Sequence, residues 1–304
     1  MKQGVYLWLV LICCFLNFQS VGQYNNKVGF NSDNDAYLLF AGDEYYTNGL
    51  EIYYTRVLTS DSETPGVIEF SANQHLFNSR RILTAELEDL DRPYAGHLFG
   101  TLSYGRILSE TSFAMAKAQL GIIGPSAFGQ EAQDLVHRIF NFEEAKGWDS
   151  QVGDEVGAHI SGYYFLELNQ TELKDNLNFE TQASLGNQFQ NGFVGILYRS
   201  GNLQPINKTA WLNLKTDRRL ESFFKLNPRL HYVHYNATIQ GGKSNDDDPL
   251  TFDVVPVVGS LDVGYFRAVN HWEMEFSVEL LTKEVDNDDA SFHQYATIGF
   301  GYLF

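Results

Sequence analysis

The chain has 304 residues, of which 14% are aromatic, and a formal net charge of −17 at pH 7. This acidic balance argues against a nucleic-acid-binding protein, whose affinity depends on clustered Lys and Arg side chains. It is compatible with bound divalent cations, although an ordinary solvated acidic surface would produce the same balance.

Residues 1–22 have the pattern of a secretory signal. Lys2 supplies a positive charge, Val5–Phe18 is mostly apolar, and Ser20-Val21-Gly22 places small residues at both ends of a cleavage site. We therefore expect the mature chain to begin near Gln23.

Both cysteines, Cys13 and Cys14, lie inside this signal. A lipoprotein signal acylated at one of them is the alternative, which the bulky Ile12 disfavours. We expect a mature chain without cysteine, which excludes disulfides and thiol catalysis.

The rest of the chain contains about twelve segments of alternating polarity separated by turn residues, and no other run approaches the ~18 apolar residues of a spanning helix. The segments are 26–35, 48–59, 66–77, 97–109, 112–123, 157–170, 177–189, 191–201, 219–232, 251–267, 271–283 and 293–304. The plainest turns are 60–62, 241–248 and 286–288, which are rich in Gly, Asn, Asp and Ser. We expect one domain over residues 23–304.

A polar cluster lies where the first two strand segments meet. Asp33-Asn34-Asp35 ends the first segment, and Asp43-Glu44-Tyr45-Tyr46-Thr47-Asn48-Gly49 leads into the second. Carboxylate and carboxamide oxygens suit Ca²⁺, but the spacing is not that of an EF-hand loop. Ordinary turn chemistry explains the same residues equally well.

Asp91-Arg92-Pro93-Tyr94-Ala95-Gly96 stands at the start of a predicted strand, where proline is tolerated. The favoured interpretation is structural, with Arg92 paired to a nearby carboxylate.

Residues 120–148 interrupt the strands with a short amphipathic helix. Ser126, after Gly124-Pro125, is a candidate N-cap, and apolar residues follow at helical spacing up to Ile139. Gln133, His137 and Phe140 share one face of this helix. From spacing alone, the favoured interpretation of His137 is a surface histidine on an extracellular loop helix.

The last two segments indicate a barrel rather than a sandwich. In His271–Leu280, large apolar residues alternate with polar ones that include Glu273, Glu275 and Glu279, which suits a wet lumen better than a dry core. The final segment alternates likewise and ends on Phe304, as outer-membrane barrels do. A soluble β-sandwich would give similar alternation, but with the signal the pattern favours an all-β, antiparallel transmembrane β-barrel with a short helical extracellular insertion.

Three stretches together resemble the outer-membrane lipid A 3′-O-deacylase family. They are Asn34-Asp35 with Tyr46-Thr47-x-Gly49-Leu50; Asp91-Arg92-Pro93-Tyr94-Ala95-Gly96; and Gly121-x-Ile123-Gly124-Pro125 through Gly129-Gln130-Glu131, Gln133, His137-Arg138-Ile139 and Trp148. The order holds over most of the mature chain, and the helical stretch is the most specific.

The resemblance implies a twelve-stranded barrel in the outer membrane of a Gram-negative bacterium, with its active site toward the outer leaflet. It implies Ca²⁺-dependent hydrolysis of the 3′-acyloxyacyl group of lipid A. The family's catalytic residues correspond here to His137, Asn34, Asp35, Thr47 and Glu143, with Asp35 and Asn34 as expected metal ligands. Arg80 and Arg81 lie in the region of further basic site residues, but their roles are not assigned.

The residues themselves agree with this chemistry. No G-x-S-x-G motif and no mature cysteine are present, so direct attack by water is preferred to an acyl-enzyme. An imidazole can take a proton from water at neutral pH. Asp33, Asp43 and Glu44 are possible additional metal ligands. We expect lipid A or lipopolysaccharide as substrate, outer-membrane lipids as surroundings and a monomer.

Two other functions fit the same sequence. A phospholipase acting on glycerophospholipids could use the same water and Ca²⁺ chemistry. A non-enzymatic barrel, such as a small porin or adhesin, could keep the motif for structural reasons.

Overall fold

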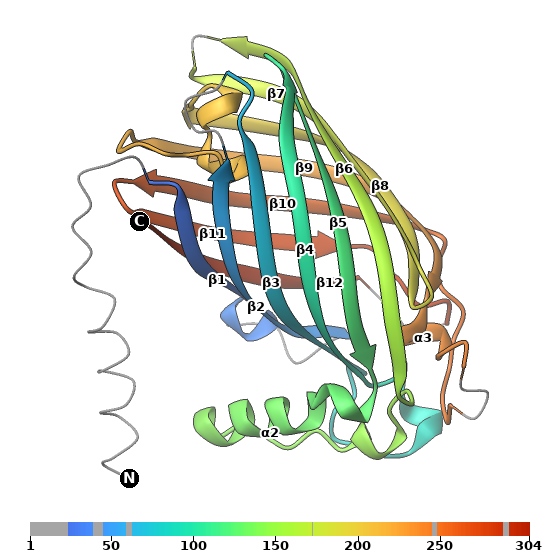
Figure 1. The fold of residues 1–304 in the computed structure, drawn as a ribbon. Coiled ribbons are helices and arrows are strands. Elements are labelled where there is room, and N and C mark those ends of the chain that lie inside the picture. The colour runs from blue at the N-terminus through green and yellow to red at the C-terminus, as the bar shows by residue number, and fades with distance from the viewer. Residues whose placement is uncertain (1–23, 39–44, 59–62, 172, 245–247, 288–291) are drawn as a thin grey trace.

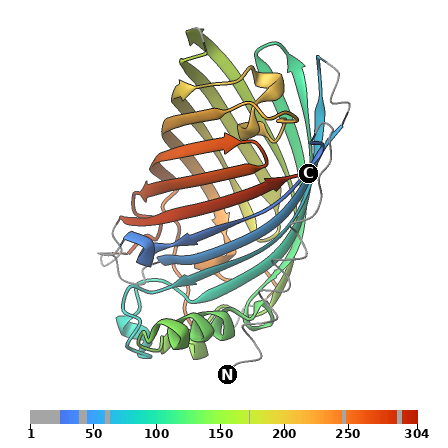
Figure 2. The ribbon, with the colours of Figure 1, turned by 90° about the vertical axis from the view of Figure 1, so that its left-hand side faces the viewer.

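The computed structural model describes residues 24–38, 45–58, 63–171, 173–244, 248–287 and 292–304, which form a closed antiparallel barrel of twelve strands (Figure 1). The strands are β1 (Asn26–Asn34), β2 (Tyr45–Leu58), β3 (Gly66–Asn78), β4 (Ala95–Ser109), β5 (Ser112–Ile123), β6 (Glu155–Thr171), β7 (Asp175–Gly186), β8 (Phe189–Asn202), β9 (Glu221–Asn236), β10 (Val257–Val269), β11 (Trp272–Leu281) and β12 (His293–Leu303). Each strand pairs with its neighbours in sequence, and β1 pairs with β12 to close the barrel (Figure 2). The predicted twelve-stranded barrel is confirmed.

The helices lie between strands. They are α2 (Gly129–Phe140) and α3 (Ala237–Gln240), with the 3₁₀ turns η1 (Asp35–Leu38), η2 (Leu87–Asp89), η3 (Pro125–Ala127), η4 (Gly147–Ser150), η5 (Ile206–Lys208) and η6 (Ala210–Leu212). Within the described residues, none of these helices has the length and apolar character needed to cross a bilayer. The predicted signal, residues 1–22, lies outside the described residues, as do Asp43 and Glu44.

One predicted strand, 251–267, begins later than expected, at Val257. Val254 forms only an isolated bridge with Val285. Pro256 explains the difference, because it has no backbone N–H to donate to a strand ladder. The predicted break at residue 190 is also displaced, since β7 and β8 are joined at residues 187–188.

Most outward-facing positions of the strands are apolar, and most inward-facing positions are polar. On β11, Trp272, Met274 and Phe276 are exposed on the outer surface, whereas Glu273 and Ser277 are buried in the lumen. This is the alternation predicted for His271–Leu280. An apolar outer surface around a polar interior is the pattern of a barrel that sits in a bilayer.

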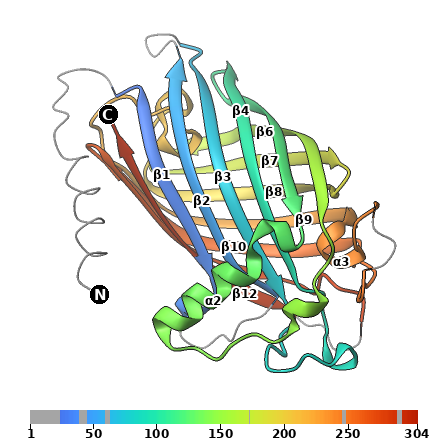
Figure 3. The same cartoon turned by 60° about the horizontal axis from the view of Figure 1, so that its bottom comes forward.

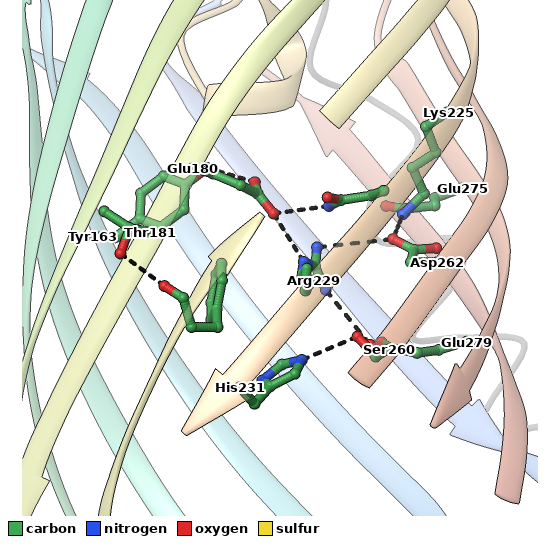
Figure 4. A network of polar contacts seen from close by, with 12 residues as sticks. Tyr163, Glu180, Thr181, Lys225, Arg229, His231, Ser260, Asp262, Glu275 and Glu279 are labelled. Atoms are coloured by element: carbon green, nitrogen blue, oxygen red, sulfur yellow. Dashed lines mark hydrogen bonds and ion pairs between the residues drawn. The ribbon is translucent and has the colours of Figure 1, made fainter. Parts of the chain in front are cut away.

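The lumen contains a network of ion pairs (Figure 4). Arg229 on β9 lies among Glu180 at 2.8 Å, Glu279 at 3.6 Å and Asp262 at 3.9 Å. Lys225, four residues before Arg229 on β9, contacts Asp262 at 2.6 Å. Opposite charges therefore compensate one another inside the barrel, where each would be costly if buried alone.

The two ends of the barrel differ. The end that holds the described termini has tight connections at 110–111 and 270–271, and there the β8–β9 segment, residues 203–220, folds back into the barrel. Ile206, Leu212 and Leu214 of that segment are buried against inward-facing residues of the strands. The opposite end carries the longer connections with α2 and α3. In outer-membrane barrels the short turns face the periplasm and the long loops face outward, so α2 lies at the extracellular rim.

Lys27 joins the inner wall to this inward-folded segment. Its ammonium group lies 2.6 Å from the Glu273 carboxylate and also donates to the side chain of Asn213. Both members of the ion pair are almost completely buried. Removing the lysine leaves the Glu273 carboxylate in the interior without its cation.

We therefore expect Lys27→Met to lower the free energy of unfolding by about 3–5 kcal/mol. The measurement is urea-induced unfolding in detergent micelles, followed by the heat-modifiable mobility of the barrel. Lys208→Met, at an exposed lysine of the same segment, is the matched control and should leave stability unchanged. Adding Glu273→Gln to Lys27→Met should recover part of the loss; an unaltered Lys27→Met barrel would contradict the assigned role.

Candidate active site

A β-bulge in β2 sets the direction of Thr47. The pairing of β2 with β3 shifts between Tyr46 and Asn48, so Thr47 is an extra residue in the ladder. Tyr46 points into the lumen, where its hydroxyl donates to Asp33 at 2.6 Å. Beyond the bulge, Asn48 and Leu50 face outward. The extra residue thus places Thr47 on the outer side, as bulges at functional sites commonly do.

Asp33 anchors the rim behind this bulge. Its carboxylate accepts hydrogen bonds from Tyr46 on β2 and from the Thr297 hydroxyl on β12, at 2.8 Å. A Cβ at Gly49, which pairs with Asp33, would collide with the Tyr46 hydroxyl, so the residue type here is constrained. Asp33 therefore belongs to the lumen side and holds together the strands that carry the outward-facing residues.

The helix α2 packs on the outside of the wall at this rim (Figure 3). Gln74, an outward-facing residue of β3, donates to the carbonyl of Ala127 at 2.7 Å just before the helix begins. Gly96 on β4 meets Gly129 so closely that a Cβ on Gly96 would lie 3.0 Å from the Gly129 Cα. The close approach of two glycines fixes the first turn of α2 against β4.

The expected N-cap, Ser126, is not the cap. The residue before α2 is Phe128, which has a left-handed conformation with φ of 57°, and no side chain caps the helix there. Ser126 instead donates to Asp154 at 2.6 Å across the 124–154 connection. The sequence prediction failed because the chain makes the separate 3₁₀ turn η3 before α2 starts.

Trp148 packs between helix α2 and the neighbouring loop and wall residues. It is 1% exposed, its indole N–H donates to the Gln133 side chain at 2.7 Å, and its ring packs edge-on against Tyr94. Leu76, outward-facing on β3, is buried in the same cluster. The helix, the 141–150 connection and the outer wall thus share one small hydrophobic core.

The pocket between α2 and the outer wall has a volume of about 390 Å³. Its lining is partly polar and partly apolar and comprises Ser32, Asn34, Ala36, Tyr37, Thr47, Asn48, Leu50, Gln133, Val136, His137 and Phe142. Three of the five predicted catalytic residues, Asn34, Thr47 and His137, are therefore brought together from segments far apart in the sequence.

His137 is buried, and its ring is oriented by the segment that follows the helix. The ring Nδ1 contacts the backbone carbonyl of Glu143. Because a carbonyl oxygen can only accept, Nδ1 carries the proton in the neutral ring, and Nε2 carries the lone pair. Phe142 packs edge-on against the imidazole at 5.8 Å between centroids. This tautomer is the one in which Nε2 can accept a proton.

Asp35 and Glu143 are placed differently from the other predicted site residues. Asp35 opens η1 beside Asn34 and is completely buried. The Glu143 side chain is exposed, and what reaches His137 is its backbone carbonyl. The backbone contact is a positional role that no sequence pattern could reveal.

The basic residues of the 79–94 connection lie near Asp91 and Asp89. Arg80 is 4.0 Å from the Asp91 carboxylate, and Arg81 donates to the Asp89 carbonyl at 3.0 Å. Arg92 makes the predicted ion pair, 3.3 Å from Glu284. Burial lowers the pKa of the Arg92 guanidinium, and the nearby Glu284 carboxylate opposes this shift. Arg92 joins the connection to the β11–β12 loop and is structural.

The side-chain atoms near the pocket that could bind a cation are the oxygens of Asp35 and Asn34. Among the residues with described positions, no group of three or more His, Cys, Asp or Glu side chains is arranged to hold a metal ion. Asp35 supplies one buried carboxylate, and the Asn34 carboxamide oxygen accepts from the backbone N–H of Ala36 at 2.7 Å. Hard oxygen donors of this kind fit Ca²⁺, which also takes backbone carbonyls and water. Asp33, a possible additional ligand, is bonded on the lumen side instead.

Several lining residues were not predicted as site residues. Gln133 had been placed on the His137 face, and the i, i+4 spacing was the signal that could have identified it. Tyr37 lines the pocket from η1, and its hydroxyl lies 2.8 Å from the Ser32 hydroxyl. Tyr37 belongs to no motif, because its proximity to the site depends on how the hairpin and the helix pack together.

An apolar outer surface, a polar filled lumen and a pocket with a buried histidine at the rim define an integral outer-membrane β-barrel with an enzyme-like site. The sequence matches the family described as "LpxR: Outer membrane protein LpxR" over residues 7–304, so the chain belongs to this family. This confirms the resemblance to the outer-membrane lipid A deacylases and the location in the outer membrane.

The fold is similar to "LpxR from Salmonella typhimurium", with a TM-score of 0.78 and 22% identity, over 91% of this chain and 100% of that one. Similarity to the β domain of the Bordetella autotransporter BrkA is much weaker, with a TM-score of 0.44 and 10% identity over 94% and 100% of the two chains. The KdgM porin gives 0.42 and 6% over 91% and 99%. A comparison with curated proteins found no match.

The core under α2 predicts the effect of Trp148→Phe. The change removes the hydrogen bond to Gln133 and part of the packing, so we expect α2 to be less stable by about 1–3 kcal/mol. Hydrogen exchange of the amides of residues 129–140 should speed up accordingly. Trp272→Phe, on the exposed surface of β11, is the control. Equal exchange in both variants would show that Trp148 does not hold the helix.

Proposed function

We propose that the protein hydrolyses the 3′-acyloxyacyl ester of lipid A with a water molecule activated by His137, in a Ca²⁺-dependent reaction. The observation that carries the proposal is the orientation of His137, whose Nδ1 is held by the Glu143 carbonyl inside a pocket shared with Asn34 and Thr47. Membership of the LpxR family supports the substrate class.

The pocket suits an ester with long acyl chains. Leu50, Val136, Tyr37 and Phe142 supply an apolar wall, while Asn34, Thr47 and His137 supply polar groups. A lipid ester has the same division between chains and a polar reacting group. The position at the extracellular rim is the level at which the lipid A of the outer leaflet would lie.

His137 has the role of general base in this mechanism. Nε2 takes a proton from water as the water oxygen bonds to the ester carbonyl carbon. When the bond between that carbon and the 3′ oxygen breaks, the imidazolium gives the proton to the departing oxygen. The products are a 3′ hydroxyl on lipid A and the free acyloxyacyl acid. Thr47 and Asn34 would orient the water or the carbonyl.

Asp35 and Asn34 would hold Ca²⁺, while Glu143 would contribute through its backbone carbonyl, which contacts the Nδ1 atom of His137. When bound, the ion would supply Lewis-acid polarisation of the carbonyl and stabilisation of the developing oxyanion. Asn34 lines the pocket from β1, and Asp35 is the next residue along the chain, so this electrostatic contribution would act close to the base.

His137→Ala is expected to lower deacylation by about 10²–10⁴-fold because the base is removed, while the barrel remains folded. The measurement is the mass spectrum of lipid A from cells that express the variant, together with heat-modifiable mobility. His234→Ala, at an exposed histidine of β9, is the control. Persistent loss of the 3′ group with His137→Ala would exclude this base.

Mass spectra of lipid A and of phospholipids from the same cells, together with conductance measurements, separate the alternatives. A phospholipase would release fatty acid from glycerophospholipids and leave lipid A intact, and a porin would leave both lipids intact and conduct ions in planar bilayers.

Removal of Ca²⁺ with a chelator is expected to stop deacylation, and added Ca²⁺ to restore it. Asp35→Asn should raise the Ca²⁺ concentration for half-maximal rate by about tenfold or more, since a buried carboxylate ligand is lost. The rate is followed against free Ca²⁺ with purified protein and lipid A in mixed micelles. A full rate in chelator would remove the metal from the mechanism.

A further inference from the structure

The helix α2 carries an exposed apolar stripe, which continues into the residues directly before and after the helix. Phe128, Leu135, Ile139 and Phe142 are 58%, 54%, 65% and 49% exposed. Leu135 and Ile139 are four residues apart on α2, which is close to one helical turn, so they project in nearly the same direction. Phe142, just past the helix end, also lines the mouth of the pocket.

The stripe faces away from the barrel wall. Gln133 and His137, on the opposite side of the helix, are buried against the wall. The wall surface under α2 is the outer one, since Leu76 and Gln74, which contact the helix region, alternate with lumen-facing residues of β3. The helix therefore lies outside the barrel, in the space that surrounds the strands.

The surface next to the helix belongs to the lipid-facing band. Leu50 lines the pocket and is exposed, and Ile52, two residues further along β2, is 59% exposed on the same side. Two residues along a strand span only about 7 Å. On β4, the exposed Leu98 lies two residues from Gly96, which contacts the start of α2. The apolar stripe, the pocket edge and the band are thus continuous.

We propose that the stripe of α2 is inserted among the acyl chains of the outer leaflet, so that the helix is a lipid-embedded wall of the pocket. The pocket then opens sideways into the bilayer between Leu50 and Phe142, and an acyl chain reaches His137 without passing through water. An amphipathic helix that lies at the membrane surface has this division of faces. The contact with acyl chains does not depend on the proposed function; only its consequence for catalysis does.

The contact is tested with a nitroxide label at Ile139→Cys in the mature protein, reconstituted in phosphatidylethanolamine and phosphatidylglycerol vesicles. Because both native cysteines lie within residues 1–22, the label would be specific. Ile52→Cys is the lipid reference and Glu88→Cys, in an exposed loop turn, is the water reference. We expect the label at 139 to be reached by oxygen and shielded from a water-soluble nickel chelate, as at 52. Nickel access equal to that at 88 would overturn the proposal.

The consequence for catalysis is tested with Leu135→Gln combined with Ile139→Gln. We expect at least a tenfold loss of deacylation for lipid A in bilayers and a loss under threefold in detergent micelles, where chains are delivered without a bilayer. Arg138→Gln, on the polar side of the same helix, should behave as the unmodified protein in both. An equal loss in bilayers and micelles would refute lateral entry. If the unmodified protein had no deacylase activity, the proposed function would fail, and the label experiment would still decide the position of the helix.

Discussion

The alternation of side chains along each strand is the constraint on which the rest of the structure depends. It sends one set of residues to the lumen and the other to the outer surface of the barrel. Ser32, Asn34 and Asn48 fall on the outer set near the rim, where the next outward-facing positions of β2, Leu50 and Ile52, are apolar. Polar groups are costly against lipid, so this part of the wall needs a cover. The helix α2 supplies it and, in doing so, creates the pocket.

Helix α2 is held over the outer wall because the loops around it contact one another and the wall. The Trp148 indole N–H donates a hydrogen bond to the Gln133 side chain, and the Glu143 carbonyl orients the His137 ring through its Nδ1 atom. Arg92 links a neighbouring connection to Glu284. The His137 imidazole is thus oriented by a backbone carbonyl and by packing against Phe142. His137 is held by elements that lie outside the barrel and are joined to its rim.

The lumen has a different task. Its ion pairs around Arg229 and Lys27 neutralise charge inside the barrel, and the segment 203–220 occupies the end opposite to α2. The Asp33–Tyr46 hydrogen bond joins the two regions, because it lies on the lumen side of the strands that present Asn34 and Thr47 outward. The interior therefore supports the strands behind the pocket, whereas the pocket itself, with His137, lies on the outer face of the wall.

The twelve alternating strands, the inserted helix and the shared face of Gln133 and His137 could be predicted from the amino-acid sequence, because these features depend on local periodicity of two or 3.6 residues. The motif resemblance also pointed to Asn34 and Thr47, which the structure places in the pocket with His137. Three features became visible in the folded chain alone: Thr47 is the bulge residue, the pocket lies outside the wall, and Glu143 contacts His137 through its backbone carbonyl. Strand register and loop packing set these, and they depend on residues such as Asp33 and Thr297, which are 264 positions apart.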